Sequence, residues 1–464
     1  ASLAEVPVTP ADAGKDAMHE RTQRAVARLM FVFCCAVPTA ITFGCVMVTW
    51  TPWYHANCVR QMERELSDAT GLVIQLQDVE RTAPGAWDLH GVELIDPETN
   101  REVARVRKIQ WASENGEASL LLHQPELESS QLKQTWRLLH DRWLCGPLAT
   151  QSALKVAGND LTIHSRFGSM TLRDVDAWIR PEEKSIEATI RGLPASSHSE
   201  VPLQLTVRRD RSGETPSTQW QLDSGGTPLP CSALSEYLPL MAGLGSQAMF
   251  SGTIAWQQTQ NEWSIDLGGS RFENISLDRL FEQHAHRLSG KADLQLDRCR
   301  IDPTQRRSDI AGSIRASRGS IGRSLLAAAQ QNLAIKVRLP EQINQSPGDI
   351  PFDRIAIGFN LNNTQLSLNG ICRNEPGYES YPSGVVMLLD GLPLATSTNT
   401  TLPALSVLTA IAPTHSVPVP VSSQTQALMN IFIPPSRPLP TVEAYPPRIR
   451  SAKNWSAGPT VVQP

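Results

Sequence analysis

The pattern of apolar and polar positions divides the chain into three kinds of sequence. Residues 29–50 contain no charged side chain. From Leu72 onward, short runs of alternating apolar and polar residues recur between turn-forming residues. Beyond Gly391, prolines interrupt every apolar run. This pattern predicts a membrane segment, then a β-rich region, then a proline-rich end.

The uncharged run predicts a transmembrane helix, and we assign residues 28–52 to this anchor. The 22 residues of the uncharged run would span roughly 33 Å, close to the thickness of a bilayer's hydrocarbon core. Trp50, Trp53 and Tyr54 follow it as an aromatic belt. The alternative is a cleaved signal peptide. However, the run is longer than a typical signal core, and no small-x-small site closes it. An uncleaved anchor is therefore expected.

The basic residues on either side of the run predict its orientation. More of them precede the run (Lys15, Arg21, Arg24 and Arg28) than follow it closely (Arg60 and Arg64). The side richer in Lys and Arg tends to stay in the cytoplasm. We therefore expect residues 1–27 to be a disordered cytoplasmic tail and the bulk of the chain to lie on the other side of the membrane.

After the anchor, the apolar period changes from that of a helix to that of a strand. Val59, Met62 and Leu66 have helical spacing, so a helix is expected over residues 55–70, ended by Gly71. From Leu72 the period is two. The later alternations predict strands that contain Leu161/Ile163, Ile186/Ile190, Leu203/Val207, Trp263/Leu267, Leu294/Leu296, Leu333/Leu339, Ile355/Phe359, Leu366/Leu368 and Val385/Leu389.

Turn-forming residues separate these runs, and the fold class expected is mainly β: an elongated, curved antiparallel sheet with a few capping helices. Turns are predicted at residues 96–98, 158–160 and 268–269. Helices are predicted at residues 131–143, 231–244, 277–288 and 323–333. The prolines and glycines of residues 227–246 suggest a boundary between β regions at 53–225 and 226–432. Residues 433–464 are expected to be a disordered, proline-rich tail.

Composition limits the class of partner and the cysteine chemistry. The net charge is −4 and the basic residues are scattered, so we expect no nucleic-acid partner. Cys34, Cys35 and Cys45 lie in the predicted membrane helix. Outside it, five cysteines are far apart and form no C-x-x-C motif, and the sequence leaves their pairing open: Cys58, Cys145, Cys231, Cys299 and Cys372.

Each candidate catalytic or metal motif has a simpler interpretation. Residues 317–324 resemble a phosphate-binding loop, but Ser317 and Arg323 stand where glycine and lysine are required. We interpret them as a strand-to-helix connection. His284 and His286 are too close in sequence to share a metal ion on a helix, so surface positions are expected. Glu63/Glu65 and Glu182/Glu183 are interpreted as solvated charges. We therefore expect no enzyme activity, no catalytic or metal site and no cofactor.

Two stretches resemble the AsmA-like envelope proteins of diderm bacteria. The first, TGLVIQLQDVERTAPGAWDLHGVELIDPETNREVARVRKIQW (residues 70–111), is similar to the first meander of that family. The second, residues 250–297, is similar to the family's C-terminal region, including a Leu-Asp-x-Leu helix and a Leu-Ser-Gly-x-Ala strand. The resemblance covers most of residues 29–390. It implies a curved sheet with an apolar inner face, anchored in the inner membrane and facing the periplasm, and it carries over no catalytic residue.

Two functions follow from these observations. The first is lipid handling or envelope biogenesis, in which the apolar sheet face is an open groove that holds phospholipid acyl chains. The second is a structural or assembly role, in which that face is a closed core and the proline-rich tail binds a protein partner. An open apolar face would support the first.

Overall fold

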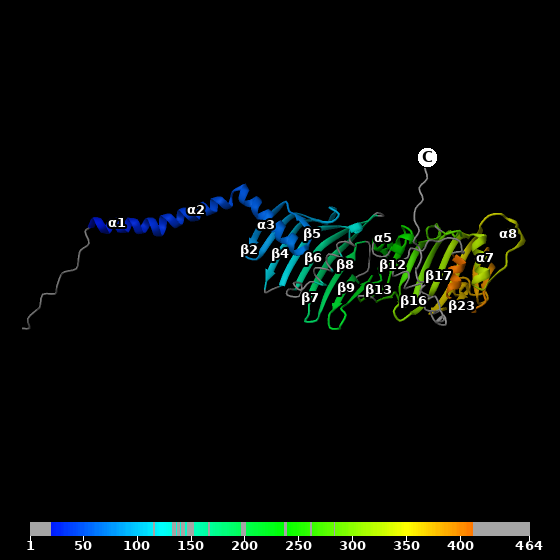
Figure 1. Cartoon of the computed structure of the whole chain (residues 1–464). Coiled ribbons are helices and arrows are strands. Elements are labelled where there is room, and N and C mark those ends of the chain that lie inside the picture. The colour runs from blue at the N-terminus through cyan, green and yellow to red at the C-terminus, as the bar shows by residue number, and fades with distance from the viewer. Residues whose placement is uncertain are drawn as a thin grey trace, which may run out of the picture. The chain divides into compact units, whose positions relative to one another are not determined.

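The computed structural model describes residues 20–411, apart from 115–116, 132–135, 137–139, 141–143, 146–152, 166–167, 196–200, 236–238, 260–261 and 283. The chain is mainly β and carries an apolar helix near its N-terminus (Figure 1), as the sequence predicted. The predicted tail at 433–464 and most of the one at 1–27 lie outside the described residues.

A long helix forms the first described part of the chain. It consists of α1 (Glu20–Phe31), a π-helical turn η1 (Val32–Ala36) and α2 (Val37–Thr49). Residues Arg24–Thr49 are long and apolar enough to cross a membrane. The helical part of the anchor prediction is therefore confirmed.

The next helix, α3 (Pro52–Thr70), ends where the sequence predicted but begins at Pro52, before the expected start at residue 55. Thr51 caps its N-terminus, where the hydroxyl accepts a hydrogen bond from the Tyr54 N–H. Pro52 occupies the first turn, where a missing N–H costs nothing. Gly71 ends the helix in the left-handed conformation, with φ of 80°.

The chain forms two compact units, residues 1–181 and residues 182–464. The sequence placed a boundary later, between 225 and 226. There the chain turns just after β10 (Ser217–Asp223), and residues 224–252, which contain short strands and helices, lead to β13 (Thr253–Gln258), which pairs with β10 in one antiparallel sheet. The glycines at this position therefore serve a connection within a sheet.

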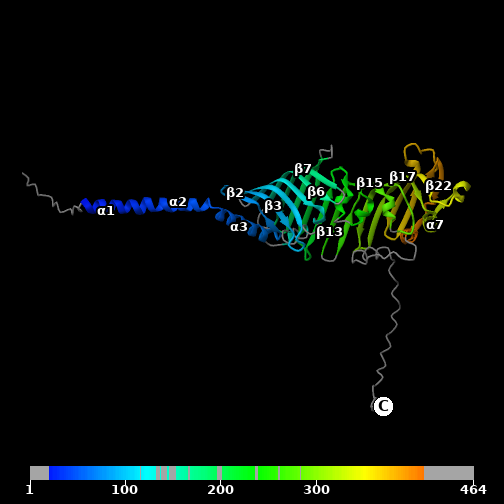
Figure 2. The ribbon, with the colours of Figure 1, turned by 90° about the horizontal axis from the view of Figure 1, so that it is seen from above.

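In the first unit, seven strands form a curved sheet (Figures 1 and 2). Both β1 and β2 pair with β3, and the ladder continues through β4, β5 and β6 to β7. The bounds are β1 (Val73–Gln75), β2 (Asp78–Ala83), β3 (Ala86–Ile95), β4 (Glu102–Glu114), β5 (Glu117–Glu128), β6 (Leu154–Ser165) and β7 (Gly168–Pro181).

One pairing in this unit departs from the predicted antiparallel sheet. β5 and β6 are parallel, whereas the other pairs are antiparallel. A parallel pair needs a long connection that returns the chain to the same end of the sheet. Residues 129–153 supply that connection, so the sheet is mixed.

The second unit contains the remaining strands, and its described pairs are antiparallel. The main ladder runs β8–β9–β10–β13–β14–β16–β17–β19–β20–β23. The other bounds are β8 (Ser185–Pro194), β9 (Leu203–Asp210), β11 (Leu229–Pro230), β12 (Met249–Ser251), β14 (Trp263–Asp266), β15 (Arg271–Ser276), β16 (Lys291–Asp302), β17 (Arg307–Ile321), β18 (Ile335–Val337), β19 (Ile350–Asn362), β20 (Gln365–Gly370), β21 (Val385–Leu389), β22 (Leu392–Ser397) and β23 (Thr401–Pro403).

The helices of the second unit only partly match the prediction. They are α5 (Cys231–Leu234), η4 (Pro239–Leu244), α6 (Leu277–Leu280), α7 (Arg323–Asn332), α8 (Glu341–Gln345), η5 (Cys372–Asn374) and α9 (Leu405–Ile411). The helix predicted at 323–333 is confirmed as α7. The one predicted at 277–288 is wrong beyond its first turn, because Leu288 forms a β-bridge with Ile321.

Two further helix predictions fall on partly described segments. Within 231–244, the described residues form two short helical pieces, α5 and η4, in place of one helix. Of the helix predicted at 131–143, most residues lie outside the described part of the chain. The strand expected over residues 333–339 is shorter than predicted, because Leu333 ends α7 and only residues 335–337 pair as β18.

Candidate functional site: the apolar sheet face

A row of apolar side chains crosses five neighbouring strands of the first unit. Residues opposite each other in adjacent strands share a face of the sheet. The paired residues, from β3 to β7, are Trp87, Trp111, Leu120, Val156 and Ala177. Each of them is half-buried. These residues define one side of the sheet, which we call the apolar face.

A second apolar row, nearer the other end of the same strands, consists of Leu94, Ala104, Leu127, Ile163 and Met170. In every strand the two rows are an odd number of residues apart, so strict alternation would place them on opposite faces. Yet Leu94 packs in one cluster with Trp87 and Trp111. The alternation therefore shifts by one position between the rows.

Residues with positive φ lie where this shift occurs. In β3, β5 and β7 they are Gly91 (56°), Gln124 (50°) and Asp174 (50°). A left-handed residue within a strand reorients the side chains that follow it. The predicted turn at 158–160 was wrong for the same reason: these residues lie inside β6, where the alternation shifts. Both rows thereby stay on the apolar face.

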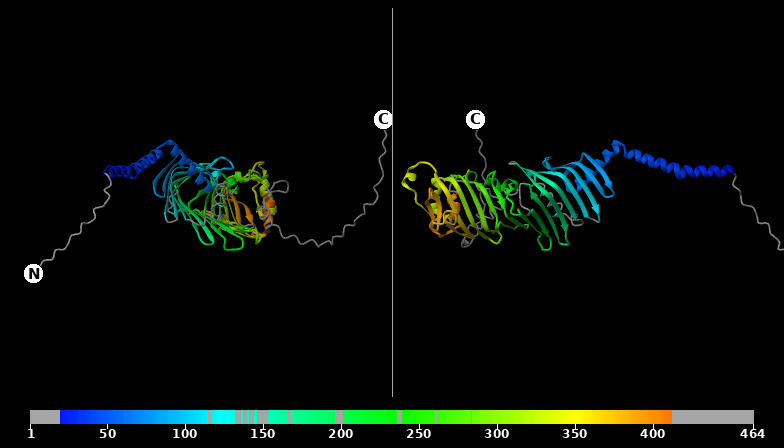
Figure 3. Two further views of the ribbon diagram at one scale, coloured as in Figure 1. Left: turned by 60° about the vertical axis from the view of Figure 1, so that its left-hand side comes forward. Right: turned by 180° about the vertical axis from the view of Figure 1, so that it is seen from behind.

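Helix α3 covers one part of this face (Figure 3). Its Val59, Met62 and Leu66 pack against apolar residues of β1 to β5, including Ile74 and Leu89. Met62 is 8% exposed, and it is the buried residue of α3. Helix α3, which follows the apolar helix Arg24–Thr49, is therefore packed directly against the sheet.

The second unit carries apolar rows of its own. One consists of Val207, Trp220, Trp256, Ile265 and Ile301, on strands β9, β10, β13, β14 and β16. The rings of Trp256 and Trp263 lie 6.3 Å apart between centroids. Apolar aromatic residues thus line one face of each unit.

The exposed fraction of apolar side chains in the middle of the second unit's sheet shows whether this side is open or is a closed core. Ile314 lies in the middle of β17, between Leu294 of β16 and Ile357 of β19. In a packed core a β-branched residue at such a position would be almost fully buried. Ile314 retains 37% of its accessible surface, and Leu294 and Ile357 are only half-buried. The apolar side of the second unit is therefore open at this position.

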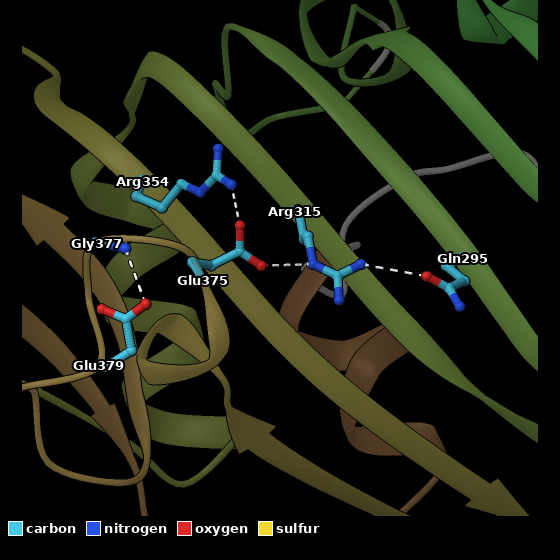
Figure 4. Close-up of polar contacts among 6 residues, drawn as sticks. All are labelled: Gln295, Arg315, Arg354, Glu375, Gly377 and Glu379. Atoms are coloured by element: carbon cyan, nitrogen blue, oxygen red, sulfur yellow. Dashed lines mark hydrogen bonds and ion pairs between the residues drawn. The ribbon is translucent and has the colours of Figure 1, made fainter.

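The opposite face of β17 and β19 carries a charged cluster (Figure 4). The Glu375 carboxylate accepts a hydrogen bond from Arg315 Nε at 2.6 Å and a second from Arg354 Nη2. Arg315 also donates to Gln295 Oε1 at 3.5 Å. Burial raises the pKa of Glu375, but the hydrogen bonds and charges of Arg354 and Arg315 outweigh it, so the pKa lies below its ordinary value. The cluster ties the segment after η5 to the sheet.

Of the histidines and glutamates considered from the sequence, His286 and Glu63 occupy different surroundings from those expected, whereas Glu65, Glu182 and Glu183 are exposed, as predicted. His286 was expected at the surface, but it is 6% exposed, and its Nδ1 lies 2.9 Å from Ser324 Oγ. Glu63 was interpreted as solvated, but it is half-buried and accepts a backbone hydrogen bond from Leu76. Both predictions were wrong, because tertiary contacts brought distant segments over these side chains.

Residues 317–324, which resemble a phosphate-binding loop, form the strand-to-helix connection that the sequence predicted. They join the end of β17 to α7, with Gly322 as the N-cap residue in an extended conformation.

Cys231, Cys299 and Cys372 are buried free thiols, and burial raises the pKa of each to about 11. The described residues contain no group of three metal-ligating side chains.

Comparisons with family models, with curated proteins and with solved structures found no match to this chain.

Proposed function

We propose that this chain is a membrane-anchored lipid-binding protein, whose apolar face holds acyl chains. The observation that supports this most directly is the half-buried row from Trp87 to Ala177, together with the 37% exposure of Ile314. Contiguous apolar surface of this kind costs free energy in water, at about 25 cal/mol per Å², and usually indicates a binding surface. A bound acyl chain would remove that cost without any catalytic step.

We also propose where such a protein acts. The helix Arg24–Thr49 anchors it, and the basic residues before that helix favour a cytoplasmic N-terminus. The two units then lie on the far side of the membrane. Together with the resemblance to AsmA-like proteins, this favours a role in lipid handling or envelope biogenesis at a bacterial inner membrane, with the units in the periplasm.

Adjacent residues on opposite faces of β5 provide the test. A photo-cross-linking amino acid at Leu120 would point from the apolar face, whereas the same group at Ser119 would point from the opposite face. We expect irradiation of the full chain in membranes to attach phospholipid at position 120 and not at 119, as read by mass spectrometry. Equal labelling, or none at 120, would refute the proposal.

A further inference from the structure

The face of the first unit opposite the apolar face contains a hollow of about 710 Å³. Most of its lining residues form two paired rows on either side of the Trp111–Ala177 row, so their side chains point away from the apolar face. Trp111, Leu120, Val156 and Ala177, between these rows, also border the hollow. Ala86, Ala112, Ser119 and Ala157, on four neighbouring strands, line it. These small side chains leave space on a sheet that larger residues would fill. The volume is typical of a small-molecule site.

The charges around the hollow balance. Two acidic residues, Asp88 and Asp176, and two basic residues, Lys155 and Arg180, line it. Asp88 is paired with Lys108 and Lys155 with Glu117, each at 2.7 Å. A strongly charged ligand would therefore lie close to a residue of its own charge, which would repel it. An acyl chain would leave the charged groups desolvated. This balance favours a ligand that is polar but uncharged.

An indole ring supplies the apolar part of the site. Trp178 lies on β7 opposite Lys155, and the Arg180 guanidinium sits 5.4 Å from its ring centroid. An aromatic ring gives a flat apolar surface at little cost in conformational entropy. Beside it, Asp176, Gln110 and Arg180 offer planar groups that accept or donate paired hydrogen bonds.

We infer that this hollow binds an uncharged oligosaccharide. A sugar ring has apolar C–H groups that would stack on Trp178, and hydroxyls that would bond to the carboxylate, amide and guanidinium groups around it. Two or three linked rings would fit the hollow's volume. The side chains assigned to the sugar point away from the apolar face, although Trp111, Leu120, Val156 and Ala177 border both. The inference does not rest on the lipid proposal.

The test is titration of the full chain in detergent with two probes, the tetramers of β-1,4-linked glucose and of β-1,4-linked N-acetylglucosamine. Isothermal calorimetry at up to about 10 mM saccharide would detect a Kd near 1 mM. We expect at least one tetramer to bind, and Trp178→Ala to weaken it by more than about tenfold. Trp53→Ala, which removes an exposed tryptophan outside the hollow, should bind like the wild type.

A second variant keeps the test valid if Trp178→Ala fails to fold. Ala157→Leu would fill the floor of the hollow from β6 and should abolish binding, while lipid cross-linking at position 120 remains. If neither tetramer binds the wild type, or if a folded Trp178→Ala or Ala157→Leu protein binds with unchanged affinity, the inference is wrong. Either result would leave the lipid proposal standing.

Discussion

The Glu63 carboxylate on α3 accepts a hydrogen bond, at 2.9 Å, from the backbone N–H of Leu76, just after β1. Ser67, one turn later on α3, accepts a second from the N–H of Ile74 at 3.0 Å. Both N–H groups lie on the outer edge of the first strand, where another chain's strand would otherwise pair. Helix α3 therefore closes this edge with side chains, and at the same time packs Met62 on the apolar face.

Replacing Glu63 by Ala should destabilise the first unit. The N–H of Leu76 would lose its partner in a partly buried position, which typically costs about 1–3 kcal/mol. Chemical denaturation of the full chain in detergent would measure the change. Glu65→Ala is the matched control, because Glu65 is exposed and bonds only to Gln61 among the described contacts. Equal effects of the two changes would show that the α3 contact contributes nothing specific.

Gly91→Ala should also destabilise the fold. Gly91 has φ of 56°, and an added Cβ would lie 2.2 Å from the Gln77 side chain. The left-handed conformation alone costs a residue other than glycine about 1–2 kcal/mol, and displacement of Gln77 adds to this. Gly213→Ala is the control, since φ there is not positive and the nearest atom is 3.7 Å away. If Gly91→Ala and Gly213→Ala had the same unfolding midpoint, the role assigned to Gly91 in the shift of alternation would be wrong.

Glu375→Gln should lower stability at neutral pH by about 1.5–3 kcal/mol, the usual contribution of hydrogen bonds to charged groups, because Arg315 and Arg354 stay partly exposed. Because the pKa of Glu375 is lower in the folded chain, its contribution is fully present above the unfolded pKa of about 4.3. The contribution is lost as the pH falls through the folded pKa.

The stability difference between wild type and Glu375→Gln should therefore shrink below about pH 4. Denaturation measured from pH 7 to pH 3 would reveal it. Glu379→Gln is the control, because among the described contacts that carboxylate accepts local backbone hydrogen bonds alone, such as the one from Gly377 N–H at 3.1 Å. A difference that stays constant across this range would exclude the proposed ion pairs.

The buried thiols should resist alkylation in the folded protein. With pKa values of about 11, Cys231, Cys299 and Cys372 would be thiolates to the order of 0.1% at pH 8. The exposed Cys145 should react first among the thiols outside the membrane helix, followed by the half-buried Cys58. Mass spectrometry after iodoacetamide treatment, with and without denaturant, would measure this. Rapid labelling of Cys372 in the folded chain would contradict its burial.

Much of the architecture followed from local pattern. An uncharged run of sufficient length determined the long helix, and Gly71 determined where α3 ends. The start of α3 at Pro52, with Thr51 as its N-cap, was not predicted. Alternation of period two identified most strands, because each has one drier and one wetter side. Alternation also predicted an apolar face on the sheet, but the sequence left undecided whether that face is open or a closed core.

Only the tertiary structure decided the rest. The parallel pairing of β5 with β6 depends on where residues 129–153 return the chain, which no local pattern specifies. The strand β6 continues through Gly158 because neighbouring strands shift their alternation at the same level, as Gln124 and Asp174 do. The burial of Glu63, His286 and Glu375 depends on partners distant in sequence, and strand pairing alone places Trp178 and Ala157 beside one hollow.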